Sequence, residues 1–512
     1  MDVKDRSFDV GGTSNNGIYV VGSKTLNSVK NSSFKVNNNN IGILVGDSSQ
    51  ATITDISENV TFDVKGTDAN SDHSGTGIYM YNGDVTVGKN VVMTGDDNDI
   101  FITIRNRDYD NKINLDGDNG PDNIRLQANG HDNVGINIQN GDSAATTGKT
   151  VEILSPNIKG WNVKFIGDNN TGIKNNFFAD TLTIKNESPL PGSLTDTGVM
   201  TITGENATGY VNLGYVNNGT LQLDYINLSG VHSVGAAFLN NNYNPNGTAP
   251  VVNAATVNTG IFNNGSGSGV KLQGVIGGTQ GGSIASPNSV GVYANTGQST
   301  KLTKASVGYS AGGATPLSDL EVELQVGFQK NANNSVLVWS ENGTKVKVKA
   351  NTYAGNLVRN TSDGIIFNGT PKFGYDETND DVVSTGSVIG YATGYLDTNK
   401  HGYIPPAGPS YFGSEIEFED GVDMLAKEGT AFLVTNGAKI TGTDVRAGGY
   451  NSILAYAKGK HALDGTPSTI EITGQIVAAD NNLLGKNNLG GGNFNPGTVV
   501  ATDIAKTYNN IG

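Results

Sequence analysis

The chain has 512 residues, a formal net charge of −15, no cysteine and 71 glycines. It has 33 Lys and Arg against 48 Asp and Glu, so it lacks the basic stripe that nucleic-acid binding requires. No apolar stretch approaches the roughly 20 residues of a membrane-spanning helix, and no apolar core of a signal peptide follows the charged residues 1–6. We expect no nucleic-acid partner, and an export signal and anchor outside this chain if the protein is secreted.

A short phrase recurs from the N-terminus onward: a glycine, a β-branched apolar residue, an aromatic or aliphatic residue, and a further apolar residue. The first three copies begin at Gly17, Gly42 and Gly77, at intervals of 25 and 35 residues. The copies, some of them loose, are 17–20, 42–45, 77–80, 135–138, 260–262, 291–294 and 364–367. Repeats of this length predict a solenoid whose units bury their apolar faces on one another. We expect the glycine to turn a corner, and the Ile, Val and Tyr positions to fill the stacked core.

Between the copies, apolar and polar residues alternate in short runs such as 60–64 and 182–184. Alternation with period two predicts strands, and the Gly, Asn, Asp, Ser and Thr clusters between them predict tight corners. No segment of ten residues has the pattern and caps of an amphipathic helix. The predicted fold is therefore all-β, a right-handed parallel β-helix with loop insertions, in which some corner Asn side chains stack in hydrogen-bonded ladders.

The composition divides the predicted coil into three parts. We expect β-helix rungs over residues 1–370, a Tyr- and Pro-rich insertion over 371–420, and further rungs over 421–512. Shorter insertions are expected near 186–199, 240–258 and 277–289. The segment 371–420 stands apart because it contains five of the 19 tyrosines and four of the 14 prolines.

The acidic clusters were considered as catalytic or metal sites. Asp and Asn gather at 96–99 and at 116–122, but Asp-Gly and Asp-Asn are ordinary turn sequences. A calcium loop fails in the second cluster because Gly120 takes the place of the third ligand. Glu415, Glu417 and Glu419 share one strand face, which we interpret as solvated. The five histidines show no metal-ligand spacing.

Nucleophilic chemistry has little support in the sequence. Gly46-Asp47-Ser48 and Gly141-Asp142-Ser143 lack the following glycine of a serine-protease motif, and the glycine-rich stretch 277–282 lacks the lysine of a phosphate loop. We therefore expect no enzymatic activity, no catalytic residue, no metal and no cofactor.

The tyrosines of the segment 371–420 are the strongest positive signal for binding. Tyr391, Tyr395, Tyr403 and Tyr411 are candidate ligand-binding residues, because tyrosine combines a flat apolar ring with a hydroxyl group. The alternative is that these rings form a small core that holds the insertion against the coil.

The Gly-Ile-Tyr phrases at 17–20, 42–45, 77–80, 260–262, 291–294 and 364–367, separated by Asn-, Gly- and Thr-rich links, resemble the passenger domains of bacterial autotransporters, the type V secretion systems. The Asn- and Lys-rich composition with recurring Gly-Ile-Tyr phrases is similar to that of the large fusobacterial autotransporter adhesins. The resemblance implies a right-handed parallel β-helix at the bacterial cell surface, a role in virulence, and anchoring through a C-terminal outer-membrane barrel outside this chain. It assigns no binding residues. The signal and barrel of the family are missing, so we expect a segment of a longer protein.

These observations favour a monomeric, non-catalytic surface adhesin segment that presents loops on a rigid β-helix to a host-cell or bacterial surface receptor, either protein or glycan. One alternative is a carbohydrate-active β-helix enzyme, a polysaccharide lyase or hydrolase, which requires several carboxylates in one groove. Another is a passive stalk of a longer adhesin.

Overall fold

The computed structural model describes most of the N-terminal half of the chain and the strands of the C-terminal half. The described residues are 1–66, 75–106, 110–117, 123–140, 149–155, 160–176, 179–186, 200–213, 216–239, 261–262, 269–277, 289–295, 319–328, 334–341, 344–349, 372–373, 375–376, 381–382, 386–394, 414–419, 422–424, 428–443, 445–447, 453–460, 467–474 and 476–478. The chain divides into two compact units. Unit 1 is Met1–Pro189, Thr195–Gly230 and Gly265–Ser268, and unit 2 is Leu190–Leu194, Val231–Asn264 and Gly269–Gly512.

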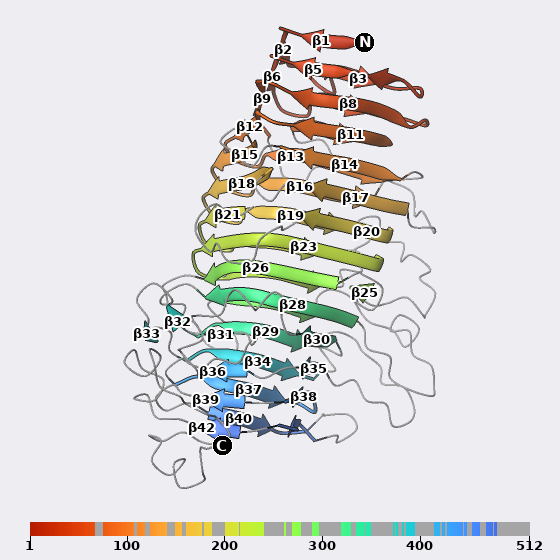
Figure 1. The fold of residues 1–512 in the computed structure, drawn as a ribbon. Coiled ribbons are helices and arrows are strands. Elements are labelled where there is room, and N and C mark those ends of the chain that lie inside the picture. Colours follow the sequence, from red (N-terminus) through yellow and green to blue (C-terminus); the bar gives the residue numbers. More distant parts are fainter. Residues whose placement is uncertain are drawn as a thin grey trace, which may run out of the picture. The chain divides into compact units, whose positions relative to one another are not determined.

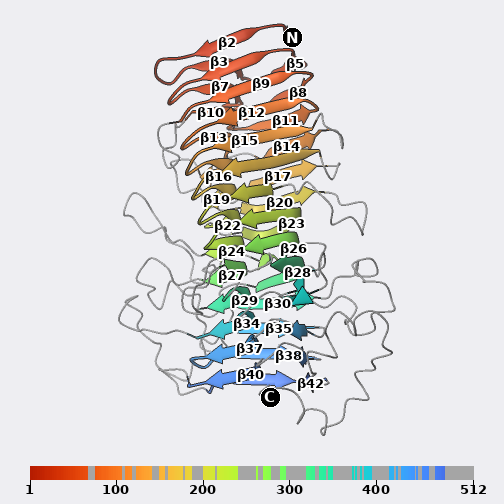
Figure 2. The ribbon, with the colours of Figure 1, turned by 90° about the vertical axis from the view of Figure 1, so that its left-hand side faces the viewer.

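In unit 1 the chain winds in successive turns, each of which adds strands to two parallel sheets, here called sheet A and sheet B (Figures 1 and 2). The strands of sheet B are β3 (Asn16–Val20), β7 (Ile41–Val45), β10 (Thr76–Met80), β13 (Ile100–Asn106), β16 (Val134–Asn140), β19 (Thr171–Asn176) and β22 (Thr208–Asn212). Those of sheet A are β1 (Asp2–Lys4), β2 (Ser7–Val10), β4 (Thr25–Leu26), β5 (Ser28–Lys30), β6 (Ser33–Val36), β8 (Ala51–Ser57), β9 (Val60–Val64), β11 (Gly83–Gly88), β12 (Val91–Gly95), β14 (Asn111–Asp116), β15 (Ile124–Asn129), β17 (Lys149–Ser155), β18 (Trp161–Ile166), β20 (Ala179–Asn186), β21 (Met200–Thr203) and β23 (Val216–Ser229).

The recurring phrase marks sheet B of unit 1. Its copies at 17–20, 42–45, 77–80 and 135–138 lie in β3, β7, β10 and β16. Register places their second residues in one column, in which β13 and β19 also contribute isoleucine: Ile18, Ile43, Ile78, Ile102, Ile136 and Ile173. From Ile43 to Ile173 this column is fully buried. The predicted parallel strands and stacked apolar core are therefore confirmed.

The glycine of the phrase has a different role from the expected one. In β3, β7 and β10 it lies inside the strand and does not adopt a positive φ, so it turns no corner. A Cβ at Gly42 would lie 2.7 Å from the carbonyl oxygen of Gly77 and 3.0 Å from the ring of Phe62. Glycine is present because two backbones and an aromatic side chain meet there.

The third residue of the phrase agrees with the expectation only in part. Its column faces away from the Ile column; Tyr19 there is 52% exposed, whereas Tyr79 is only 5% exposed. Aromatic side chains enter the core from both sheets: Tyr210 is fully buried in the Ile column of sheet B, and in sheet A Phe8, Phe34 and Phe62 stack with ring centroids 4.7 Å apart at both steps. Successive turns therefore bury like side chains on like, as a solenoid requires.

Unit 2 continues the same architecture with three parallel sheets. Its sheet B strands are β24 (Ser233–Leu239), β27 (Ser289–Asn295), β29 (Val336–Glu341), β34 (Val388–Thr393), β37 (Thr430–Thr435) and β40 (Ile453–Lys458). Its sheet A strands are β25 (Ile261–Phe262), β26 (Gly269–Gly277), β28 (Asp319–Phe328), β30 (Lys345–Lys349), β35 (Glu415–Phe418), β38 (Lys439–Gly442) and β41 (Thr469–Ile472). A third sheet contains β31 (Lys372–Phe373), β36 (Val422–Met424), β39 (Val445–Ala447) and β42 (Ile476–Ala478), and β32 (Tyr375–Asp376) pairs antiparallel with β33 (Asp381–Val382).

Two predictions about unit 2 change in detail. The phrase copy at 260–262 contributes β25, which pairs with β28 of sheet A rather than joining sheet B. The predicted insertion 371–420 contains β34 and β35, and both pair in register with the turns before and after them. These strands belong to the coil, because their apolar positions continue its buried columns. The copy at 364–367 lies outside the described residues, as do nearly all of the shorter predicted insertions.

Within the described residues the fold is all-β, and no helix there is long and apolar enough to cross a membrane.

Candidate functional site

A column of aromatic residues follows the outer face of sheet B in unit 2. Register aligns one residue from each of five successive strands, β27, β29, β34, β37 and β40. We call this column the aromatic ladder; its members are Tyr293, Trp339, Tyr391, Leu433 and Tyr456. It arises because each strand presents the residue after an inward-facing position, such as Val292 or Val338, to the outside.

The rings of the aromatic ladder contact one another. The centroids of Tyr293 and Trp339 are 4.8 Å apart, and those of Trp339 and Tyr391 are 5.4 Å apart. Trp339 and Tyr391 also pack on a buried apolar cluster formed by Val336, Val388 and the ladder's own Leu433. The first three rings are half-buried, whereas Tyr456 is 44% exposed. The rings of Trp339 and Tyr391 are stacked, with 28° between their planes, whereas those of Tyr293 and Trp339 are tilted by 42°.

A polar column lies beside the aromatic ladder, two residues further along each strand. We call it the polar column; its members are Asn295, Glu341, Thr393, Thr435 and Lys458. The Glu341 carboxylate accepts hydrogen bonds at Oε2 from the Tyr293 hydroxyl and from Asn295 Nδ2, both at 2.9 Å. On the next strands Thr435 Oγ1 donates to Thr393 Oγ1 at 2.9 Å.

Glu341 is the member of the polar column with the most perturbed electrostatics. Burial raises the pKa of its carboxyl above the ordinary value of 4.5, and the hydrogen bond from Tyr293 opposes this shift only in part. Among the described residues, no Lys or Arg lies within ion-pair distance of Glu341. Perturbed carboxyl groups beside aromatic side chains are frequent features of binding sites.

The structure includes one of the four predicted binding tyrosines among its described residues. Tyr391 lies in the aromatic ladder; Tyr395, Tyr403 and Tyr411 lie outside the described residues. Tyr293, Trp339 and Glu341 were not predicted as site residues from the sequence. The phrase at 291–294 already contains Tyr293, but its neighbours in the ladder follow at irregular intervals, so only strand register brings them together.

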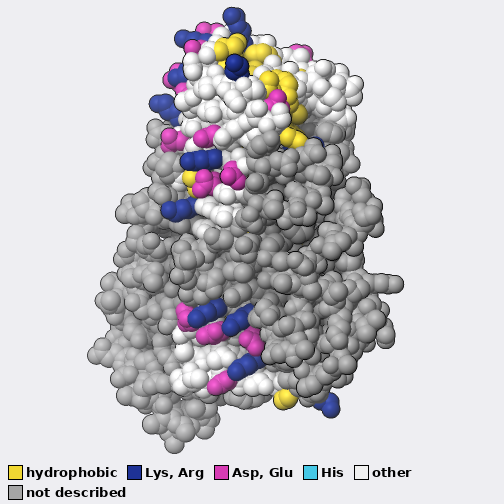
Figure 3. Space-filling model, turned by 90° about the vertical axis from the view of Figure 1, so that its right-hand side faces the viewer, with side chains coloured by type: hydrophobic (Ala, Val, Ile, Leu, Met, Phe, Trp, Pro, Cys, Tyr) yellow, Lys and Arg dark blue, Asp and Glu magenta, His cyan; other side chains and the backbone are white. Residues whose placement is uncertain are grey.

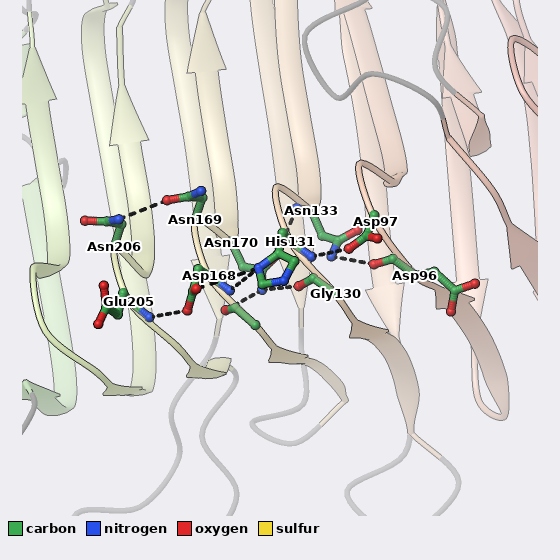
Figure 4. Close-up of polar contacts among 11 residues, drawn as sticks. Asp96, Asp97, Gly130, His131, Asn133, Asp168, Asn169, Asn170, Glu205 and Asn206 are labelled. Atoms are coloured by element: carbon green, nitrogen blue, oxygen red, sulfur yellow. Dashed lines mark hydrogen bonds and ion pairs between the residues drawn. The ribbon is translucent and has the colours of Figure 1, made fainter.

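A second candidate region is a corner of unit 1 where acidic residues and His131 stack on successive turns (Figure 4). Each side chain accepts the backbone N–H of the next turn: Asp97 Oδ1 from His131 at 2.7 Å, His131 Nδ1 from Asp168 at 3.0 Å, and Asp168 Oδ1 from Glu205 at 2.8 Å. These residues satisfy the exposed backbone of the corner. This arrangement agrees with the interpretation of the 96–99 cluster as turn chemistry.

Asparagine ladders accompany these corners. Asn59 Nδ2 donates to Asn31 Oδ1 at 3.2 Å, and Asn206 Nδ2 donates to Asn169 Oδ1 at 3.0 Å. All four have positive φ, between 46° and 65°. The predicted hydrogen-bonded Asn ladders are therefore confirmed, since Asn tolerates this conformation and also pairs with itself.

A buried ladder lies just before the sheet B strands, and one of its members is a carboxyl group. Asn133 Oδ1 accepts the backbone N–H of Asp99 at 2.9 Å, and Asn170 Oδ1 accepts that of Asn133 at 2.8 Å. Asp99 occupies a position equivalent to these asparagines and is fully buried. Desolvation raises the pKa of Asp99 to about 7, although its carboxyl accepts hydrogen bonds from the backbone of Gly66 and Asp96.

The three glutamates at 415–419 lie on the outer face of sheet A in unit 2, where acidic and basic residues alternate. Glu415 lies between Lys345 and Lys439 in register, and Lys347 pairs with Glu417 at 3.8 Å and with Glu419. Figure 3 shows such alternation on the described part of one face of the molecule. The glutamates therefore belong to a solvated face with ion pairs, as interpreted from the sequence. No group of three or more His, Asp or Glu in the described part of the chain is arranged to hold a metal ion.

Comparison with known proteins identifies no relative: no family model, no curated protein and no solved structure matches this chain.

Proposed function

We propose that the chain is a non-catalytic segment of a bacterial surface adhesin and that the aromatic ladder of unit 2 is its recognition surface. The main observation behind this proposal is the alignment of Tyr293, Trp339 and Tyr391 beside the half-buried Glu341. Aromatic rings with polar neighbours recur at protein recognition sites, because they bury much area and lose little side-chain entropy. The ladder takes its order from the coil, so a rigid scaffold holds it before any receptor arrives.

The proposal extends to fold and location. The coil is a right-handed parallel β-helix, as about 98% of parallel crossover connections are right-handed. Its resemblance to autotransporter passengers supports display at the outer membrane of a bacterium, on an anchor outside this chain. The net charge of −15 supports this role, because like charges on an exposed protein discourage self-association.

The test is binding of the purified chain to bacterial and host cells. Trp339→Ala and Tyr391→Ala should each reduce binding by about tenfold or more, since truncated aromatic anchors commonly cost 2 kcal/mol or above, roughly. Phe165→Leu, a conservative change inside unit 1, is the control and should leave binding unchanged. If both ladder variants bind like the unmodified chain, the ladder is not the recognition surface, and the stalk alternative is favoured.

A further inference from the structure

No Lys or Arg among the described residues lies within ion-pair distance of the Glu341 carboxylate. Both of its hydrogen bonds come from neutral donors and both go to Oε2, so Oε1 accepts none from the described residues. A half-buried carboxylate is costly unless it is paired, and two neutral donors compensate only part of that cost. Some other carboxylates of unit 2 have cationic partners, such as Glu471 with Lys439 at 3.0 Å. Glu341 has no such partner among the described residues.

The neighbours of Glu341 suit a positively charged, slender group. Tyr293 and Trp339 lie on the adjoining column, and aromatic rings attract cations electrostatically. Trp339 and Tyr391 pack on the buried cluster of Val336, Val388 and Leu433, and as half-buried rings they keep some apolar surface for an alkyl chain. An ion pair at the carboxylate and an apolar contact beside it are thus available a short distance apart.

The stacking of the rings helps to select the ligand. Sugar rings bind aromatic side chains through an open ring face, but Trp339 has Tyr293 on one side at 4.8 Å and Tyr391 on the other at 5.4 Å. Since both neighbours of Trp339 are rings, a flexible methylene chain fits beside it more readily than a pyranose, which needs an open ring face. Lysine combines such a chain with a terminal ammonium group. Its methylene chain commonly lies on an apolar surface while the ammonium group stays in polar surroundings.

We infer that the Glu341 carboxylate, with Tyr293 and Asn295 as its orienting donors, binds the ammonium group of a lysine side chain on a protein receptor, while Trp339 and Tyr391 contact its methylene chain. The inference rests on the proposed function in one respect, namely that the aromatic ladder is the recognition surface. The acidic chain favours such a ligand, because a net charge of −15 raises the local concentration of cations.

The test uses the chain's two tryptophans as reporters. With 15N-tryptophan, the full chain gives indole N–H signals from Trp161, buried in unit 1, and from Trp339 in the ladder; a Trp339→Phe variant assigns them. The probe is Nα-acetyl-lysine methylamide. It should move the Trp339 signal in a saturable way at millimolar concentration and leave Trp161 unmoved. Norleucine analogues of the probe, which lack the ammonium group, should not move either signal.

Two variants make the result specific. Glu341→Gln retains the shape and the acceptor oxygen for Tyr293 but removes the charge, and it should weaken lysine binding by about tenfold. Glu417→Gln, on the charged outer face of sheet A, is the matched control and should bind like the unmodified chain. No shift of Trp339 with the lysine probe, or equal binding by Glu341→Gln, overturns the inference.

A parallel titration with glucosamine distinguishes an amine on a sugar from the amine of a lysine side chain. Tighter binding of glucosamine than of the lysine probe would overturn the assignment to a protein receptor. This titration needs no receptor and no cells, so its failure is distinguishable from a failure of the proposed adhesin function, which cell binding measures.

Discussion

The outward column of sheet B differs between the two units, although the strands that carry it are alike. In unit 1 this column reads Tyr19, Leu44, Tyr79, Thr103, Asn137, Lys174 and Val211. In unit 2 it reads Ala237, Tyr293, Trp339, Tyr391, Leu433 and Tyr456. The inward columns are apolar in both units with few exceptions. The coil therefore constrains its interior, and leaves the outward column free to diverge from a mixed surface to an aromatic one.

The polar neighbours of the two columns differ as well. In unit 1 the Tyr79 hydroxyl accepts a hydrogen bond from Arg105 Nη1 at 3.4 Å. In unit 2 the Tyr293 hydroxyl donates to the Glu341 carboxylate. The same tyrosine position is thus associated with a cation in one unit and with an anion in the other. This reversal supports a separate function for unit 2.

The largest expected effect is on stability: truncating a buried aromatic side chain should cost more than truncating one in the outward column. Phe62→Ala should destabilise unit 1 by about 3–5 kcal/mol, because Phe62 is fully buried and stacks on Phe34. Tyr391→Ala should destabilise unit 2 by only about 1–2 kcal/mol, because its ring is half-buried. Urea unfolding followed by fluorescence of Trp161 or Trp339, with the other tryptophan changed to Phe, measures each unit. Equal losses would mean that the aromatic ladder is simply additional core.

Asp99 gives unit 1 a pH dependence. A raised carboxyl pKa means that the folded state binds the proton more tightly than the unfolded state, so stability is highest below the ordinary pKa of 3.8 and falls as pH rises to about 7. The loss should be on the order of 2–4 kcal/mol, as each unit of pKa difference corresponds to about 1.4 kcal/mol.

Asp99→Asn removes the titrating group and should flatten this dependence. The measurement is urea unfolding of unit 1, reported by Trp161, between acidic and neutral pH. Asp97→Asn, at the exposed corner, is the control and should keep the slope. A slope that survives in Asp99→Asn would assign the titration to other carboxyl groups.

The smallest of these effects concerns the glycine of the repeated phrase. Gly42→Ala should cost about 1–3 kcal/mol, because the new Cβ would lie 2.7 Å from the carbonyl oxygen of Gly77. Gly11→Ala is the matched control, since its Cβ would meet only Asn37 Nδ2, at 3.8 Å, and its φ is not positive. Thermal unfolding of the two variants compares them. Equal melting temperatures would show that the turns separate easily at this point and that close packing is not the reason for the glycine.

The phrase predicted more of the fold than of the candidate site. Its recurrence indicated parallel strands in stacked turns, and its second residue became the buried Ile column from Ile43 to Ile173. The expectation for its glycine was wrong, because the reason for that residue lies in the next turn, at the Gly77 carbonyl, and not in the local backbone. The expectation for its tyrosine was wrong at Tyr19, which is 52% exposed, but not at Tyr79, which is buried, since alternation alone does not say which positions are covered.

The candidate site shows the same limit. Tyr391 was predicted because its segment is rich in tyrosine and proline, yet its ring partner Trp339 comes from a strand about fifty residues earlier, which also carries Glu341. The intervals between these strands vary with the loops that separate them, so no fixed period aligns the residues.

By itself, the sequence determined that this is a Cys-free, acidic, all-β chain of stacked parallel strands with asparagine at its corners, because period-two alternation and positive-φ residues are local properties. The tertiary structure alone decided which residues became neighbours across the turns. Register joined Tyr293, Trp339 and Tyr391 into one ladder and set Glu341 beside it, with no cationic partner in the described part of the chain. The physical reason is that contacts between turns depend on the pairing of backbone hydrogen bonds, which short-range sequence patterns do not specify.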